Sequence, residues 1–345
     1  MDLTIAAILG LDGLTNGAIY ALVALALVLV FSVTRVIFIP QGEFVAFGAL
    51  TLAALQLGKV PGTVWLLLLM AVAATVLDLV QGLRERWPVG RLAQKLLATL
   101  GFPLAVSGVT HWLAPQQPPL IMQVALTLSL VTAMGPLLYR LAYRALSSAS
   151  VLTLLIVSVG VHFGLTGIGL VFFGAEGYRT PAFWDARFDV GPLAFTGQTI
   201  IIFGASIALL VGMFLFFERT LTGKALRATS VNRTGARLMG ISGDAAGSLS
   251  FTMAAFIGAL SGLLISPSTT IYYDTGFLIG LKGFVAAVFG GLASFPMALA
   301  GAIGVGLIES FGSFWASAFK EVIVFTVILP VLLWRSFVDP HHEEH

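Results

Sequence analysis

Long apolar runs separated by short polar stretches dominate the chain. A membrane-spanning helix needs about 20 consecutive, mostly apolar residues. By this measure the pattern predicts eleven segments, at 14–34, 43–58, 62–80, 96–113, 119–139, 151–173, 200–217, 246–267, 279–293, 297–314 and 321–337. We therefore expect an all-α, polytopic bundle that forms one domain over 1–345 with no appended soluble domain. The piece at 3–11 is too short to span by itself.

Two of these segments, 43–58 and 279–293, are short and interrupted by glycine. Both are candidates for half-helices, which a membrane tolerates only where protein or a cavity surrounds them. "GEFVAFGAL" (42–50) and "KGFVAAVFGGL" (282–292) are alike in sequence. The expected topology runs these two stretches in opposite directions. The pattern therefore predicts a weak inverted repeat.

Composition supports a membrane protein. The 345 residues are 58% hydrophobic and 10% charged, whereas soluble domains carry about 25% charged residues. The 38 glycines fit helices that pack closely, and the absence of cysteine excludes disulfides and thiolate metal sites. The opening "MDLTIAAILG" lacks the basic region that a secretory signal needs.

The distribution of basic residues predicts the orientation, because Lys and Arg stay on the cytoplasmic side. Eleven spans place 13 of the 18 basic residues on one side, namely Arg35, Arg84, Arg86, Arg91, Lys95, Arg140, Arg144, Arg219, Lys224, Arg227, Arg233, Arg237 and Arg335. We expect the N-terminus outside and the C-terminus in the cytoplasm.

The predicted outer face carries one long loop, 174–199. Within it "FDVGPLAF" alternates around a Gly-Pro turn, which predicts a small β-hairpin. The tail "DPHHEEH" holds three histidines. We interpret it as a solvated chain end rather than a metal site.

The polar strip 218–244 interrupts the apolar pattern in the second half of the chain. Its "TLTGKAL" resembles the end of a phosphate-binding loop, but that motif needs Gly at 218 and Ser or Thr at 225. Glu218 and Ala225 stand there instead, so this loop does not bind ATP.

Read as one helix, 223–240 places Ala225, Ala228, Val231 and Leu238 towards one side. Gly240 is suited to end such a helix. Two interpretations remain open. The strip is either a solvated basic loop or a docking helix for a cytoplasmic partner.

Part of the strip resembles the EAA loop of permease subunits from ATP-binding-cassette importers, which reads Glu-Ala-Ala, three residues, then Gly. Ala236 and Gly240 match this loop, while Thr234 and Gly235 replace its Glu and its first Ala. Further stretches resemble the branched-chain amino acid permeases, in particular the shorter of their two permease subunits; these are 17–37, 42–49, 139–150, 223–241 and 280–310. The resemblance covers most of 10–80 and 135–338.

The resemblance implies a type II importer-like permease of the bacterial inner membrane, without catalytic residues, metal or cofactor. Its cargo would be branched-chain amino acids or related small organic solutes, moved from periplasm to cytoplasm. Its partners would be a distinct second permease, two cytoplasmic ATP-binding subunits and a periplasmic binding protein, with no nucleic acid. The residues implied in ATPase coupling are Arg227, Arg233, Thr234, Gly235, Ala236, Leu238 and Gly240.

Two departures from the family pattern stand out. The family usually has Asn-Phe-Ala-His-Gly-Glu where this chain has Phe-Ile-Pro-Gln-Gly-Glu at 38–43, so the histidine is replaced by Gln41. The stretch 81–134 looks like an insertion containing two extra spans, which would leave the orientation of everything downstream unchanged.

Charged residues within membrane segments are functional candidates by default. They are Glu43, Asp78, Lys282 and Glu309, with His111 and His162 beside them. Glu43, Lys282 and Glu309 are the candidates for the translocation pathway. For Glu43 the alternative is capping of its own helix, and for Asp78 it is a place at the membrane interface. We expect Glu43 and Lys282 to pair, because an isolated charge in a membrane costs about 2.5–3.5 kcal/mol.

Two other classes of protein compete with the importer permease. A stand-alone transporter driven by an ion gradient would need several acidic residues at mid-membrane and would not need the strip 218–244. A membrane-embedded enzyme would need a histidine-rich metal cluster or a Ser/His/Asp grouping, and neither pattern occurs in the sequence.

Overall fold

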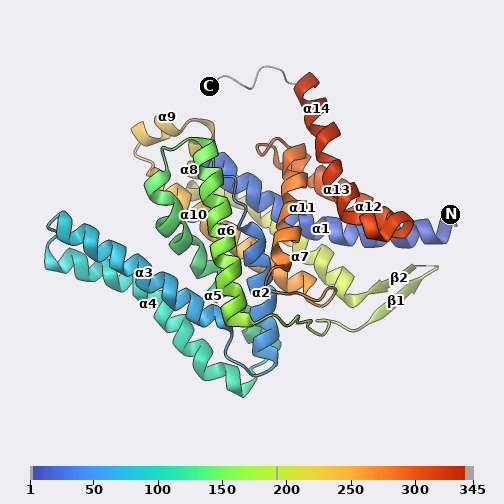
Figure 1. Ribbon diagram of the computed structural model, residues 1–345, viewed down its shortest axis with the longest axis horizontal. Helices are drawn as coiled ribbons and strands as arrows, with labels where there is room; N and C mark the ends of the chain where they lie inside the picture. The colour runs from blue at the N-terminus through green and yellow to red at the C-terminus, as the bar shows by residue number, and fades with distance from the viewer. Residues whose placement is uncertain (1–2, 192, 339–345) are drawn as a thin grey trace.

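The computed structural model describes residues 3–191 and 193–338 (Figure 1). The histidine-rich tail lies outside these residues. The helices are α1 (Leu3–Thr34), α2 (Gln41–Gln56), α3 (Gly62–Arg84), α4 (Val89–Leu113), α5 (Leu120–Leu138), α6 (Val151–Phe173), α7 (Gly197–Arg219), α8 (Leu221–Val231), α9 (Arg233–Leu238), α10 (Gly243–Ile265), α11 (Thr275–Phe289), α12 (Phe295–Ala316), α13 (Lys320–Thr326) and α14 (Ile328–Val338). The strands β1 (Arg187–Val190) and β2 (Leu193–Thr196) form one hairpin.

Prolines and polar caps mark the helix starts. The helices α2 to α5 each begin directly after a proline, at Pro40, Pro61, Pro88 and Pro119. Proline suits a helix start because its missing N–H has no partner there in any case. A side-chain oxygen caps each of α6 to α10 and α12; the capping residues are Ser150, Thr196, Thr220, Asn232, Ser242 and Ser294.

Each predicted apolar segment falls on helix, but the helices do not all have full spanning length. Eight helical runs in the described part of the chain are long and apolar enough to cross a membrane. α2 has 16 residues and α11 has 15. The last two predicted segments form one apolar run over Phe295–Leu333. The structure supports eight full-length spans and two short helices, and the count of eleven stays a prediction.

The piece at 3–11 is not separate, because α1 runs unbroken over 32 residues. Its extra turns pack against α12 in antiparallel contact. A Cβ atom at Gly13 or Gly17 would touch the α12 backbone at Leu307 or Ile303. Small residues let the two backbones approach this closely. Within the added turns, the Ser310 hydroxyl of α12 donates a hydrogen bond of 2.7 Å to the Leu9 carbonyl.

α1 lies at the centre of the bundle, with every residue from Ile19 to Val30 buried. α12, α10 and α11 surround it, and α10 also packs on α2 and α5. The last apolar run breaks between α13 and α14. Pro330 is the cause, since its ring clashes with the carbonyl four residues earlier, at Thr326, where α13 ends.

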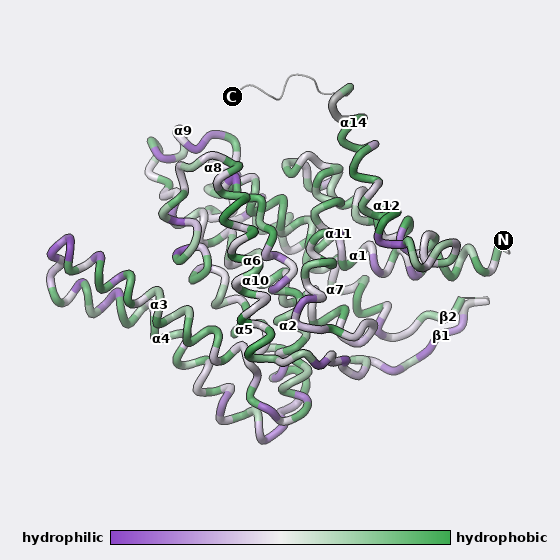
Figure 2. The backbone as a smooth tube through the Cα atoms, viewed as in Figure 1, coloured by the Kyte–Doolittle hydropathy of each residue, from purple (hydrophilic) through white to green (hydrophobic). Residues whose placement is uncertain are grey.

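α3 and α4 form a long hairpin that projects from the bundle (Figure 1). Apolar residues cover much of its outer surface (Figure 2), as expected for helices facing lipid. α5 belongs to the bundle instead, because it packs along α10. The interpretation of 81–134 as an insertion stays a prediction. The structure shows that the second helix of that stretch is part of the core.

The hairpin predicted in the loop 174–199 is confirmed. β1 and β2 are antiparallel, with Phe188 opposite Phe195 and Asp189 opposite Ala194.

Candidate functional site

The polar strip folds into two short helices, α8 and α9, rather than the single helix predicted over 223–240. Asn232 makes the break. Its backbone is extended, and its side-chain oxygen accepts a hydrogen bond of 2.7 Å from the N–H of Gly235. Asparagine caps a new helix better than it continues an old one.

Gly240 ends α9, as predicted. Its φ of +83° lies in the left-handed region. The Ile241 N–H donates to the Ala236 carbonyl at 3.0 Å, and the Gly240 N–H donates to the Arg237 carbonyl at 3.0 Å. This pair of bonds is the Schellman arrangement, which favours glycine at this position.

The outward face of the strip is apolar where α8 and α9 end. Val231, Leu238 and Met239 are 81%, 83% and 83% exposed. Thr234 is also exposed. Exposed apolar side chains that lie together outside the membrane-spanning helices are typical of a surface that binds another protein.

Other residues implied in coupling hold the strip in place. Ala236 is buried, and Arg227 pairs with Glu218 at 3.0 Å. Arg233 donates from Nε and Nη2 to the Val33 carbonyl near the end of α1, at 3.0 and 2.6 Å. Burial lowers the pKa of the Arg233 guanidinium from its ordinary value. α9 is thus bonded to the central helix of the bundle.

The predicted pair of Glu43 with Lys282 is wrong, because each residue has another partner. Glu43 at the start of α2 lies 2.6 Å from Nδ1 of His162 on α6, and both side chains are buried. The His162 ring stacks on Phe277 of α11, with centroids 4.6 Å apart. Glu43 therefore has a histidine partner. This histidine comes from α6 and not from position 41, where the family usually has one.

Lys282 pairs with Glu309, the third residue assigned to the pathway. Its Nζ lies 2.6 Å from Glu309 Oε1 and 3.2 Å from Glu321 Oε1. The Tyr20 hydroxyl donates to the other oxygen of Glu309 at 2.5 Å. This cluster of Tyr20, Lys282, Glu309 and Glu321, the lysine cluster, joins α1, α11, α12 and α13.

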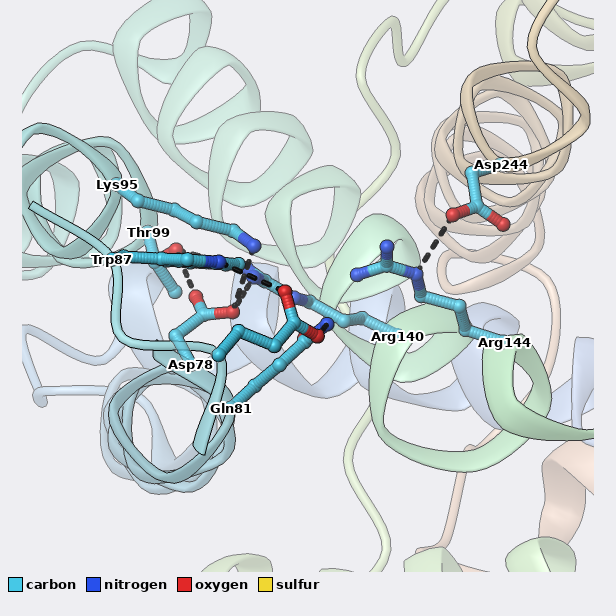
Figure 3. A network of polar contacts seen from close by, with 9 residues as sticks. Asp78, Gln81, Trp87, Lys95, Thr99, Arg140, Arg144 and Asp244 are labelled. Atoms are coloured by element: carbon cyan, nitrogen blue, oxygen red, sulfur yellow. Dashed lines mark hydrogen bonds and ion pairs between the residues drawn. The ribbon is translucent and has the colours of Figure 1, made fainter. Parts of the chain in front are cut away.

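Asp78 is buried in a second polar network, between α3, α4 and α5 (Figure 3). It accepts a hydrogen bond of 3.0 Å from Thr99 and lies 3.5 Å from Lys95 Nζ. It also forms an ion pair with Arg140, which extends from the segment after α5. The network ties the α3–α4 hairpin to the bundle, so Asp78 is more than an interfacial charge.

The sequence did not point to Tyr20, Arg140 or Glu321 as partners of the candidate charges. Each meets its partner across a long stretch of chain, for example 289 residues between Tyr20 and Glu309. His111, the remaining candidate, lies beside Trp65 with the two rings nearly perpendicular and their centroids 6.4 Å apart.

Comparison with known proteins shows where this architecture belongs. A family model described as "Branched-chain amino acid transport system / permease component" matches residues 9–332. The high-affinity branched-chain amino acid transport system permease protein BraD of Pseudomonas aeruginosa is 26% identical over 338 residues, covering 94% of this chain and 92% of BraD. LivH of Escherichia coli, which is also named as a high-affinity branched-chain amino acid transport system permease protein, is 24% identical over 93% of this chain and 91% of its own length.

A more distant relative is named for a different cargo. The xylose/arabinose import permease protein XylH of Sulfolobus acidocaldarius is 28% identical over 180 residues, covering 50% of this chain and 46% of XylH. These relatives are permease proteins and not enzymes. With a match over nearly its whole length and eight apolar helices of spanning length, the chain is an integral membrane protein and belongs to the family of branched-chain amino acid transport permease components.

Proposed function

We propose that the chain is one of two permease subunits in an ATP-binding-cassette importer of the bacterial inner membrane. It moves branched-chain amino acids or related small organic solutes from periplasm to cytoplasm. Two cytoplasmic ATP-binding subunits supply the energy, and a periplasmic binding protein delivers the cargo. The match to permease components over residues 9–332 carries this proposal.

The strip formed by α8 and α9 supports coupling to a separate ATPase. Its exposed apolar residues Val231, Leu238 and Met239 offer a contact surface, and the Arg233 bonds to the end of α1 connect that surface to the bundle. A force on α9 would reach the central helix directly. The positive-inside pattern supports a cytoplasmic position for this strip and an outer position for the β-hairpin.

The relatives support an amino acid as the cargo more strongly than a sugar. BraD and LivH match over more than 90% of this chain, whereas XylH matches over half of it. The chain carries one strip of this kind. ATPases of this class work as pairs, so a second, distinct permease would supply the second contact.

The proposal is tested by reconstituting the chain in vesicles with a second permease, the ATP-binding subunits and the binding protein from the same genome. We expect ATP hydrolysis to rise when the binding protein carries leucine, isoleucine or valine, and radiolabelled amino acid to enter the vesicles. A sodium or proton gradient without ATP should drive no uptake. Gradient-driven uptake by the chain alone would show a secondary transporter, and full activity without the second permease would rule out the heterodimer.

The double substitution Leu238→Asp with Met239→Asp should uncouple the transporter while leaving the chain folded. Both side chains are 83% exposed, so the fold does not depend on them. Truncating or charging central apolar contacts at an interface typically costs 2 kcal/mol or more, about thirtyfold in affinity. The measurement is cargo-stimulated ATP hydrolysis and pull-down of the ATP-binding subunits.

Leu83→Asp is the matched control, because Leu83 is 66% exposed near the end of α3 on the same predicted face but outside the strip. It should retain full coupling. If cargo still stimulates ATP hydrolysis to the wild-type level in the double variant, α9 is not part of the docking surface.

A further inference from the structure

A groove of about 580 Å³ lies between the α3–α4 hairpin, the end of α5 and the start of α10. Apolar side chains line its walls, among them Phe102 and Pro103 of α4 and Ala133 and Leu137 of α5. Phe102 is 58% exposed. The groove therefore has an apolar wall, contributed by α4 and α5, beside a polar part that includes the start of α10.

Three cations stand at one end of this groove: Lys95, Arg140 and Arg144. Their ion-pair partners are Asp78 and Asp244. Glu85 and Arg91 also act on the charge of Lys95, so the four cations of this region outnumber its three carboxylates by one. The Arg140 guanidinium forms an ion pair with Asp78 and donates a hydrogen bond to the Thr99 hydroxyl. Lys95 lies 3.5 Å from Asp78 and 4.2 Å from the centre of the Trp87 ring, and it remains about one-third exposed.

The Arg144 guanidinium bonds Asp244 through Nε alone, at 2.9 Å. Its two terminal nitrogens can therefore donate hydrogen bonds to another group. In Figure 3 the rest of the guanidinium points away from Asp244 and toward the Asp78 network. Lys95 and Arg144 both line the groove, the first from α4 and the second from the segment after α5. An anion between them would receive charged hydrogen bonds from both.

The predicted topology places these groups on the side of the membrane where cytoplasmic headgroups lie. Lys95 is near the start of α4, Arg144 follows the end of α5, and Asp244 is in the first turn of α10. Because α5 runs in the opposite direction to α4 and α10 in the predicted topology, all three positions are on the same, predicted cytoplasmic side. Below them the groove continues along apolar residues of α4 and α5.

We propose that this groove binds an anionic phospholipid. Its phosphate lies between Lys95 and Arg144, and an acyl chain follows the apolar wall past Phe102. Basic pockets between membrane helices on the cytoplasmic side are suited to anionic headgroups. The lipid fills the gap between the α3–α4 hairpin and the bundle, next to the Asp78 network that joins them.

The test is lipid-dependent thermal unfolding of the 345-residue chain purified in mild detergent, with native mass spectrometry of retained lipid. Phosphatidylglycerol should raise the melting temperature and stay bound, while phosphatidylcholine at the same concentration should do neither. Arg144→Gln should raise the phosphatidylglycerol concentration needed for half the effect about fivefold, the expected contribution of one cation near the surface. Lys95→Gln should weaken binding similarly, since Arg140 still neutralises Asp78 in that variant.

Arg86→Gln is the control, because Arg86 is an exposed cation between α3 and α4 that does not line the groove. It should bind phosphatidylglycerol as the unsubstituted chain does. Equal weakening in this control would show a diffuse charge effect and overturn the proposal. So would equal protection by phosphatidylcholine, protection by inorganic phosphate alone, or unchanged phosphatidylglycerol binding in Arg144→Gln and Lys95→Gln.

Discussion

Replacing Lys282 by methionine is expected to destroy most of the folded protein. In the lysine cluster its ammonium lies between the carboxylates of Glu309 and Glu321, at 2.6 and 3.2 Å. Without it two acidic groups face each other beside the Tyr20 hydroxyl. Breaking a buried ion pair by removing one partner costs about 3–5 kcal/mol, because the remaining charge is left uncompensated.

The double variant Lys282→Met with Glu309→Gln should recover much of this loss. It removes one charge of each sign, and the side chain of Glu321 is 34% exposed, so water can still reach it. Residues that share a buried contact show such non-additive effects. The measurements are folded yield by size-exclusion chromatography and melting temperature in detergent. Strictly additive losses would contradict the pairing.

Lys59→Met serves as the matched control for charge removal. Lys59 is exposed in the turn between α2 and α3 and forms no ion pair within the described residues. Its loss should leave the yield unchanged. Lys282→Arg keeps the charge and should fall between the unsubstituted chain and the methionine variant.

The helices could be predicted from sequence because a backbone in lipid must satisfy its own hydrogen bonds. Apolar length therefore translates into helix. Several of these helices begin directly after a proline in the structure, as α3 does after Pro61. Hydropathy could not show how α1 packs on α12, because that depends on the fit of Gly13 and Gly17 against a helix about 290 residues further along the chain.

The candidate charges were also visible in the sequence, but their partners were not. The cost of an isolated charge predicts that Glu43 has a partner without saying which. His162 lies 119 residues away and reaches Glu43 only because α6 packs beside α2. The apolar spacing in the strip predicted one helix, whereas the structure has two. The Asn232 side chain caps the start of α9, and this interaction interrupts the helix despite the apolar spacing on either side.

The sequence match between 42–50 and 282–292 places Gly42 level with Lys282. In the structure Gly42 instead meets Gly276, six residues earlier in the chain. α2 and α11 lie side by side (Figure 1) and meet near their starts. A Cβ atom on Gly42 would collide with the carbonyl of Gly276, and one on Gly276 would collide with the carbonyl of Gly42. Such reciprocal contact is what a two-fold axis between the helices would produce. The inverted repeat itself stays a prediction.

Gly42→Ala and Gly276→Ala should each separate these two helices. A methyl group at either position has no room, because the atoms it meets are backbone and cannot rotate away. Overpacking costs about 1–3 kcal/mol where side chains can yield, and we expect the upper end or more here. The shift would also move Glu43, next in sequence to Gly42, away from His162.

Gly160→Ala is the control for these two variants, because it should not lower the melting temperature. Gly160 is in the middle of α6, and a Cβ atom there would meet nothing within 4 Å. Alanine favours a helix over glycine by about 0.5–1 kcal/mol. This variant should therefore melt at the same temperature as the unsubstituted chain or higher, while the two crossing variants melt lower. Melting temperatures that rise in all three would mean that α2 and α11 do not touch at Gly42 and Gly276.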